Sequence, residues 1–189
     1  KNDKEKNVLI KNISDDEQIY RALCLGVKDY FKKSGFKKAI LGLSGGIDSA
    51  LTAAIATEAL GSENVIGISM PSKFSSEHSK SDAQQLAENL GIQFQTIPID
   101  ESYQNIINSM DIFFKETSSG LAEENLQARI RGNILMSISN KIGALLLNTG
   151  NKTELALGYC TMYGDMCGAL GVISDLNKLQ VYSVSRWIN

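Results

Sequence analysis

The sequence has little of several residue types on which common functional sites depend. Of its 189 residues, one is histidine (His78), two are prolines and three are cysteines. Since no histidine lies near the cysteines, we expect neither a His-based catalytic triad nor a histidine metal cluster. Cys24, Cys160 and Cys167 are too few and too scattered for a disulfide framework or a zinc site. We therefore expect reduced thiols and a cytoplasmic protein.

Long apolar runs and an excess of basic charge are missing as well. No run approaches the roughly 18 to 20 residues that span a bilayer, and the polar start of the chain lacks the apolar segment of a signal peptide. The formal net charge is -2 and no basic stripe stands out, so we expect neither a membrane nor a nucleic acid as partner. Hydrophobic residues make up 43% of the chain, which is typical of a globular protein, and the length suits one domain.

Apolar runs alternate with amphipathic segments along the chain. Ser14 and Glu17 form the pattern of a capping box, and Gly35 would end the helix that follows. The alternation predicts an α/β fold, a doubly wound parallel sheet with helices on both faces. The expected strands are 36–43, 65–68, 92–99 and 143–148, and the further expected helices are 48–60, 79–90, 102–116, 121–141 and 181–188.

Residues 44–49, Ser-Gly-Gly-Ile-Asp-Ser, lie between an expected strand and an expected helix. The two adjacent glycines allow a sharp turn and a close approach of the backbone to a ligand. The amides at the start of the helix favour a phosphate-like anion, and the two serines add hydroxyl donors. Asp48 would repel that anion unless a cation lies between them, which suggests a Mg²⁺ ion carrying the phosphates. The loop is neither a Walker A motif nor the dinucleotide motif Gly-x-Gly-x-x-Gly.

This loop resembles the S-G-G-x-D-S loop of the ATP pyrophosphatase (PP-loop) superfamily. The resemblance implies an enzyme that cleaves ATP between its α and β phosphates and adenylates a carbonyl or carboxylate oxygen. A nitrogen or sulfur nucleophile then displaces AMP. The loop alone leaves several families open, among them GMP synthetase, asparagine synthetase, argininosuccinate synthetase and tRNA-thiolating enzymes.

Three further strings resemble NAD synthetase and are most similar to the synthetase domain of its glutamine-dependent form. They are MPSKFSSEHS at 70–79, LAEENLQARIRG at 121–132 and NTGNKTELALGYCTMYGD at 148–165. The resemblance implies ATP-dependent amidation of nicotinic acid adenine dinucleotide (deamido-NAD) to NAD through an adenylated carboxylate, with release of AMP and pyrophosphate. It also implies a homodimer, and we place the contact on the long expected helix 121–141.

The resemblance implies roles for individual residues. ATP would be bound by Ser44, Gly45, Gly46, Asp48, Ser49, Met70 and Thr149, and Mg²⁺ by Asp48 and Glu154. Deamido-NAD would contact Asn125, Glu154, Tyr159, Thr161 and Asp165. Asp48, Glu154 and Asp165 would be the catalytic acids, and Asp165 could hold an incoming ammonium ion and take its proton.

Several of these residues have a plainer alternative. Glu154 could be a solvated acid in the first turn of a helix, and Asn125 could be a polar residue at a helix start. Asp165 could form a turn with the glycine before it, and Met70 could be an ordinary core residue.

The chain differs from the glutamine-dependent enzymes in extent. We expect 1–16 to be a polar lead or linker, where those enzymes have a nitrilase-like glutaminase domain, and 17–189 to be the synthetase domain. The resemblance implies that a further C-terminal segment of the family would lie beyond residue 189. The nitrogen source would be ammonia, or glutamine through a glutaminase domain or subunit outside this chain. Two other functions stay open: another PP-loop amidating or thiolating enzyme (GMP synthetase-like or tRNA-thiolating), and a non-catalytic ATP-binding module.

Overall fold

The computed structural model describes residues 13–115 and 117–189 and confirms the predicted α/β fold. Every neighbouring pair of strands in its sheet is parallel. Ile40, in the central strand, lies opposite Ile66 on one side and Leu146 on the other. The strands are β1 (Lys38–Gly42), β2 (Val65–Ser69), β3 (Gln93–Thr96), β4 (Ala144–Asn148) and β5 (Leu170–Gly171), in the spatial order β3-β2-β1-β4-β5.

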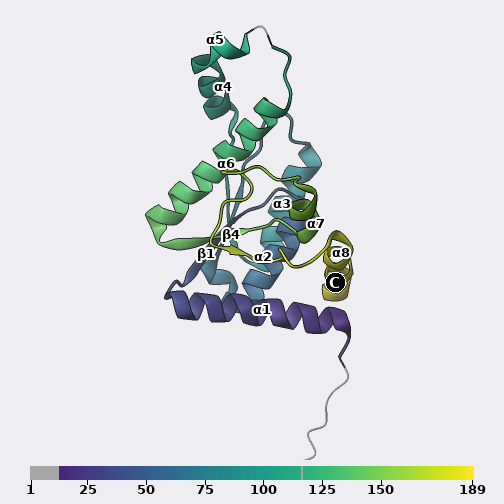
Figure 1. Cartoon of the computed structure of the whole chain (residues 1–189). Helices are drawn as coiled ribbons and strands as arrows, with labels where there is room; N and C mark the ends of the chain where they lie inside the picture. Colours follow the sequence, from purple (N-terminus) through teal and green to yellow (C-terminus); the bar gives the residue numbers. More distant parts are fainter. Residues whose placement is uncertain (1–12, 116) are drawn as a thin grey trace, which may run out of the picture.

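Helices cover both faces of this sheet (Figure 1). One face carries α1 (Asp15–Ser34), α2 (Ile47–Leu60), α3 (Glu77–Leu90) and α8 (Lys178–Ile188). The other carries α6 (Leu121–Ile142) and the start of α4 (Asp100–Ser109). The remaining helices are short: η1 (Ser62–Asn64), α5 (Asp111–Phe114) and α7 (Lys152–Leu157).

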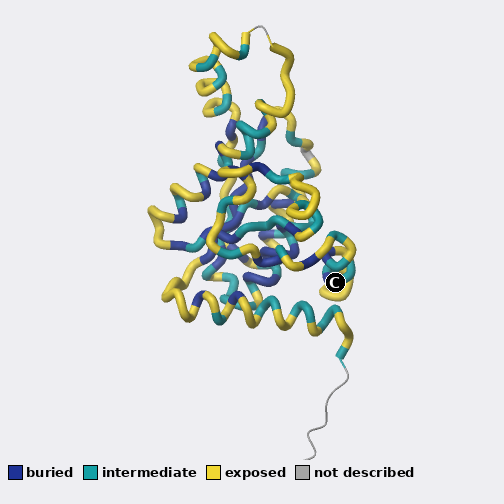
Figure 2. Tube along the Cα trace, in the orientation of Figure 1, coloured by how far each residue is buried: buried dark blue, intermediate teal, exposed yellow. Residues whose placement is uncertain are grey.

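The two faces bury separate hydrophobic cores, and β1 contributes to both. Ala39 and Leu41 point into the core under α1, α2 and α8, whereas Ile40 between them points into the core under α6. All three are fully buried, as the two-residue period of a central parallel strand requires. In Figure 2 the buried residues gather around the sheet, and α4 and α5 stand out from it with mostly exposed residues.

The strand order changes direction at β1. From β1 the chain proceeds outward through β2 to β3, and β4 then pairs with the opposite edge of β1. In open α/β sheets, ligands bind beyond the carboxyl ends of the strands at such a switch point. The segments that follow β1 and β4 are residues 43–46 and 149–151, so the fold brings the predicted loop and the start of the third motif together.

The predicted elements are confirmed with shifted ends. The strand expected at 92–99 ends at Thr96, because Pro98 has no N–H for the ladder. The helix expected at 102–116 is divided into α4 and α5 at Met110, and residue 116 lies outside the described residues. Ser14 caps α1 by accepting from Glu17 N at 3.2 Å, but the Glu17 carboxylate pairs with Arg21. Residues 1–12 of the expected polar lead also lie outside the described residues.

Candidate active site

The loop 44–49 is held in shape by its own hydrogen bonds. Ser49 Oγ donates to Gly46 O at 2.9 Å and lies 3.2 Å from Ser44 Oγ. Ser44 N donates to Ser49 Oγ at 3.3 Å, and Ser49 is 3% exposed. No side chain caps α2, whose N-cap is Gly46, so its first amides keep the free donors and positive partial charge that favour an anion. The Ser49 hydroxyl, predicted as a phosphate donor, is thus engaged inside the loop.

Gly45 has a reason to be glycine that the sequence did not indicate. Its φ is +79°, and a Cβ there would lie 2.4 Å from Ser79 O in the first turns of α3. A side chain would therefore collide with the backbone of α3 before it met a ligand. A Cβ on Gly46 would meet only Ser44 Oγ, at 3.2 Å.

Asp48, in the first turn of α2, meets two partners from distant parts of the chain. Asn151 Nδ2 donates to Asp48 Oδ1 at 3.0 Å, although the residues are 103 positions apart. Lys178 Nζ, 130 positions away at the start of α8, forms an ion pair with Asp48 Oδ2. The Asp48 side chain is 19% exposed and that of Lys178 is 35% exposed, so solvent screens this pair only in part.

Glu154 lies on the other side of Asn151. Asn151 N donates to Glu154 Oε2 at 3.0 Å, and Asn151 Oδ1 accepts from Glu154 N at 3.1 Å. The two residues form a capping box at the start of α7. The predicted first-turn position of Glu154 is confirmed, and one buried residue links the two acids: the backbone N of Asn151 donates to the Glu154 carboxylate and its side-chain Nδ2 donates to Asp48.

Two cavities open on this arrangement and share Ser44, Asn148, Thr149 and Asp165. The first, called the acid-lined cavity, has a volume of about 380 Å³ and is lined in addition by Asp48, Ser49, Glu154, Tyr159 and Cys160, among others. The second, called the apolar cavity, has a volume of about 360 Å³ and is lined in addition by Gly42, Ile68, Met70, Leu135, Leu146 and Cys167, among others.

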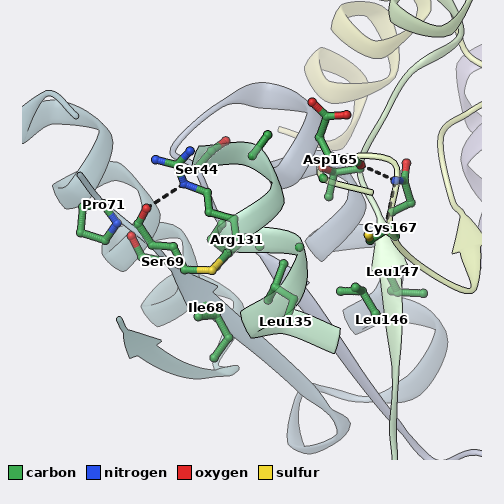
Figure 3. Close-up of a pocket in the computed structure, with 18 of the residues that line it drawn as sticks. Ser44, Ile68, Ser69, Pro71, Arg131, Leu135, Leu146, Leu147, Asp165 and Cys167 are labelled. Carbon is green, nitrogen blue, oxygen red and sulfur yellow. Dashed lines mark hydrogen bonds between the residues drawn. The ribbon is translucent and has the colours of Figure 1, made fainter. Parts of the chain in front are cut away.

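Arg131, labelled in Figure 3, is one of three charged residues that line the apolar cavity; the others are Lys80 and Asp165. Its Nε donates to Met70 O at 3.0 Å and so links α6 to the end of β2. Burial lowers the pKa of the guanidinium, and the Asp100 carboxylate opposes that shift. Met70 is 8% exposed and packs in the core under α6, so it is both a core residue and a cavity residue.

Three of the five predicted dinucleotide residues, Asn125, Thr161 and Asp165, are joined by hydrogen bonds beside the start of α6. Thr161 Oγ1 donates to Asn125 Oδ1 at 2.7 Å, and Thr161 N donates to Asp165 Oδ1 at 2.7 Å. Asn125 and Thr161 line neither cavity, whereas Asp165 lines both and Tyr159 lines the acid-lined one. Asp165 therefore closes the local turn, as the plainer alternative has it, and also borders the site.

Close backbone packing fixes the segment 158–168 against α6. A Cβ on Gly132 would lie 2.7 Å from Gly164 O, and a Cβ on Gly164 would lie 2.9 Å from the carbonyl carbon of Ala128. Neither glycine has room for a side chain. The segment lines part of both cavities, and its position against α6 therefore depends on Gly132 in α6 and Gly164 in the segment.

The sequence profile of the NAD synthase family matches residues 19–189. The chain belongs to the NAD synthase family. A glutamine-dependent NAD(+) synthetase from Synechocystis is 60% identical to it over 175 residues, which are 93% of this chain and 31% of that protein. The chain thus spans 31% of the length of that relative.

Two solved structures show that the NAD synthase fold is present over nearly the whole chain. A glutamine-dependent NAD+ synthetase from Acinetobacter baumannii, in complex with ADP, superposes with a TM-score of 0.92 at 43% identity and covers 94% of this chain and 34% of its own. An NH3-dependent NAD synthetase from Campylobacter jejuni, in complex with the nitrate ion, gives 0.85 at 33% identity and covers 94% of this chain and 75% of its own. Both are PP-loop proteins, which confirms the superfamily that the loop 44–49 indicated.

The acids of this NAD synthase family member fit a magnesium ion that is shared with a ligand. Within 13–115 and 117–189, no group of three or more His, Cys, Asp or Glu side chains could hold a metal by itself. Mg²⁺ needs no such group, because it is usually bound through one or two carboxylates together with phosphate oxygens and water. Asp48 and Glu154, which line one cavity, are the residues that would hold it.

Within the described residues, 13–115 and 117–189, no helix is long and apolar enough to cross a membrane.

Sequence reasoning missed Asn151 and Lys178. Asn151 stood in the quoted motif, and its position three residues before Glu154 could have indicated a helix cap. Nothing in the sequence could have indicated its contact with Asp48. Lys178 belonged to none of the quoted strings. It reaches Asp48 because Asn177 caps α8 by accepting from Gln180 N at 3.0 Å, and because Lys178 N donates to Thr153 Oγ1 at 3.0 Å.

Proposed function

We propose that this chain carries the site for ATP-dependent amidation of deamido-NAD to NAD. ATP would be split into AMP and pyrophosphate, and ammonia would be the nucleophile at this site. The observation that carries the proposal is the pair of acids from distant segments, Asp48 and Glu154, joined through Asn151 beside the uncapped start of α2. A family that binds a magnesium–polyphosphate complex needs negative and positive groups arranged side by side in this way.

The two cavities would bind different parts of ATP. Adenine would enter the apolar cavity beside Met70 and Leu135, and the phosphates would pass Ser44 to reach the free amides of α2. A bound Mg²⁺ would neutralise phosphate charge and make pyrophosphate a better leaving group. Lys178, already paired with Asp48, supplies a second positive charge at the same place.

The chemistry balances with these residues. An oxygen of the nicotinate carboxylate attacks the α-phosphorus of ATP, and the bond to pyrophosphate breaks. Ammonia then attacks the acyl carbon, and AMP leaves with the carboxylate oxygen that carried it. Ammonium must lose a proton before it attacks, and Asp165, on the acid-lined cavity, is the carboxylate that would accept it.

A panel of substrates distinguishes this proposal from its alternatives. Release of AMP and pyrophosphate from ATP is measured in the full-length protein with deamido-NAD, xanthosine monophosphate or tRNA, each with ammonia or a sulfur donor. We expect turnover with deamido-NAD and ammonia. Turnover with xanthosine monophosphate or tRNA instead would support another PP-loop enzyme, and tight ATP binding without turnover would support a binding module.

Several exposed apolar side chains favour a homodimer. Ile112 is 86% exposed, Phe113 is 78% exposed and Leu121 is 71% exposed, on α5 and the first turn of α6. Later turns of α6 bury Ile130 and Leu135 against the sheet, so its first turns and α5 are left to meet a second copy. Light scattering tests this proposal: a dimer that Phe113→Glu dissociates supports it, and a monomeric protein overturns it.

The three unpaired cysteines agree with a cytoplasmic setting. Glutamine as the final nitrogen source would require a glutaminase domain or subunit outside residues 1–189. The chain's coverage of 31% of its Synechocystis relative leaves room for one.

A further inference from the structure

We propose that Asn151 is a positioning residue that locks Asp48 and Glu154 into one metal-binding pair. The inference rests on the proposed function, because it assumes that these acids hold the Mg²⁺ of a magnesium–ATP complex. It goes beyond that function by assigning their geometry to a neutral side chain that itself need not touch the metal.

Asn151 is the most enclosed polar residue of the site. It is 0% exposed, and both ends of its amide are engaged: Nδ2 with Asp48 Oδ1 and Oδ1 with Glu154 N. Its backbone N donates in addition to Glu154 Oε2 at 3.0 Å. A buried amide that leaves no group unsatisfied keeps a single orientation, because any rotation would strand a donor or an acceptor without a partner.

Capping alone does not account for this arrangement. A cap needs only the side-chain oxygen, whereas Nδ2 of Asn151 donates to Asp48, an acid in α2. The chain offers a comparison in Asn177, which caps α8 with the same capping box to Gln180 but is exposed. Asn151 differs from Asn177 in its burial and in the acid that it holds.

The bonds of Asn151 have a consequence for the two carboxylates. Each has one oxygen tied to Asn151, Oδ1 in Asp48 and Oε2 in Glu154. The second oxygen of Asp48 already accepts a cation, the ammonium of Lys178. Asn151 thus fixes the rotation of both acids and leaves one oxygen of each for positive charge. Partners of this kind, which orient metal ligands without binding the metal, typically change metal affinity when they are lost.

The test measures how strongly Mg²⁺ and ATP help each other to bind. The dissociation constant of ATP is determined by calorimetry with Mg²⁺ and again with EDTA, and the ratio of the two is the metal coupling. Asn151→Ser keeps a capping hydroxyl and loses the donor to Asp48. Ser14→Ala, which removes the cap of α1, is the control for the loss of a cap away from both cavities. We expect the coupling to fall about 10- to 100-fold in Asn151→Ser and to be unchanged in Ser14→Ala.

Further variants separate positioning from loss of structure. In an Asp48→Asn background, Asn151→Ser should change the coupling little, because the acid through which it acts is gone. If Asn151→Ser does not fold, Asn151→Thr, which fills more of the vacated space and also caps, takes its place. An unchanged coupling in Asn151→Ser would overturn the proposal, whether ATP affinity stays the same or falls equally with and without Mg²⁺.

The assay keeps the failure of this inference distinct from the failure of the proposed function. It needs neither deamido-NAD nor turnover, so a protein that makes no NAD but whose metal coupling is lost in Asn151→Ser would overturn the function and leave the role of Asn151 supported. A wild-type protein that makes NAD and shows no metal coupling would overturn the role of Asn151 alone.

Discussion

The two cavities of the site share four residues and differ in almost everything else. The acid-lined cavity is bounded in part by Asp48 and Glu154, whose carboxylates are held from behind by hydrogen bonds to Asn151 and, for Asp48, by the ion pair with Lys178. The apolar cavity is bounded by strand ends and by α6, and its wall is continuous with the hydrophobic core. One cavity depends on the orientation of charges and the other on shape.

This difference predicts how each cavity responds to change. Orientation of charge acts on the transition state, so its loss should lower turnover. Shape acts on the substrate and the transition state alike, so its loss should weaken binding. The following predictions separate the two cavities by these responses, beginning with the largest effect.

Asp48→Asn should nearly abolish turnover. The change keeps the shape of the side chain and removes a charge that would hold Mg²⁺, so adenylation should fall by about a hundredfold or more. The measurement is deamido-NAD-dependent release of pyrophosphate from ATP in the full-length protein. Asp82→Asn, at an exposed residue of α3, is the matched control and should behave as wild type. Near-normal turnover of Asp48→Asn with unchanged Mg²⁺ dependence would contradict the account.

Glu154→Gln should lower turnover in the same way, and combining it with Asp48→Asn should cost less than the two separate losses multiplied. Residues that serve one metal are not independent, and we expect a shortfall of about tenfold or more. The double-mutant cycle uses the same pyrophosphate assay. Fully multiplicative losses would mean that the two acids act on separate events.

Gly42→Val should weaken ATP binding and leave the dependence on Mg²⁺ unchanged. A Cβ on Gly42 would lie 3.4 Å from Leu135 Cδ1 and 3.5 Å from Met70 Cε, so a larger side chain would fill the apolar cavity. We expect KM for ATP to rise about tenfold with little change in kcat, because overfilling a packed site costs about 1–3 kcal/mol. Gly42→Ala is the control and should be tolerated. An altered Mg²⁺ requirement in Gly42→Val would show that the cavities are not separate.

The smallest effect is expected in the alkylation of the cysteines, where adenosine should change the labelling rate of a protected cysteine by a few-fold. Cys167 lines the apolar cavity and Cys160 the acid-lined one, so adenosine should protect Cys167 and leave Cys160 reactive. Burial raises the pKa of Cys24, which packs against the core under α1, α2 and α8, to about 11. Since the thiolate is the reactive form, Cys24 should react slowly at pH 8 and faster as the pH rises toward 11. Mass spectrometry of the labelled peptides gives the three rates, and equal protection of Cys160 and Cys167 by adenosine would contradict the assignment.

The fold was predictable where the sequence carries a local pattern. Apolar runs such as that of β1 predicted the strands, and stop signals such as Gly35 predicted where the covering helices end. β5 was not predicted, because Leu170 and Gly171 are too short a run to show a period. The division between α4 and α5 at Met110 has no glycine or proline to signal it.

The candidate site was predictable where residues lie in one contiguous motif. The loop 44–49 and the position of Glu154 in the first turn of α7 followed from short strings. The partners of Asp48 could not follow, because Asn151 and Lys178 meet it only when the sheet closes distant segments together. Gly45 shows the same limit: its conformation was foreseeable, and the backbone of α3 that excludes a side chain was not.

The central claim is that the acid-lined cavity activates a carboxylate by transferring AMP to it. Deamido-NAD labelled with ¹⁸O in the nicotinate carboxylate tests this most directly, in the full-length protein with ATP, Mg²⁺ and ammonia. The account predicts that mass spectrometry finds one ¹⁸O atom in each AMP released, because the carboxylate oxygen that attacks the α-phosphorus leaves with AMP. Label in inorganic phosphate, or AMP free of ¹⁸O while NAD is formed, would contradict it.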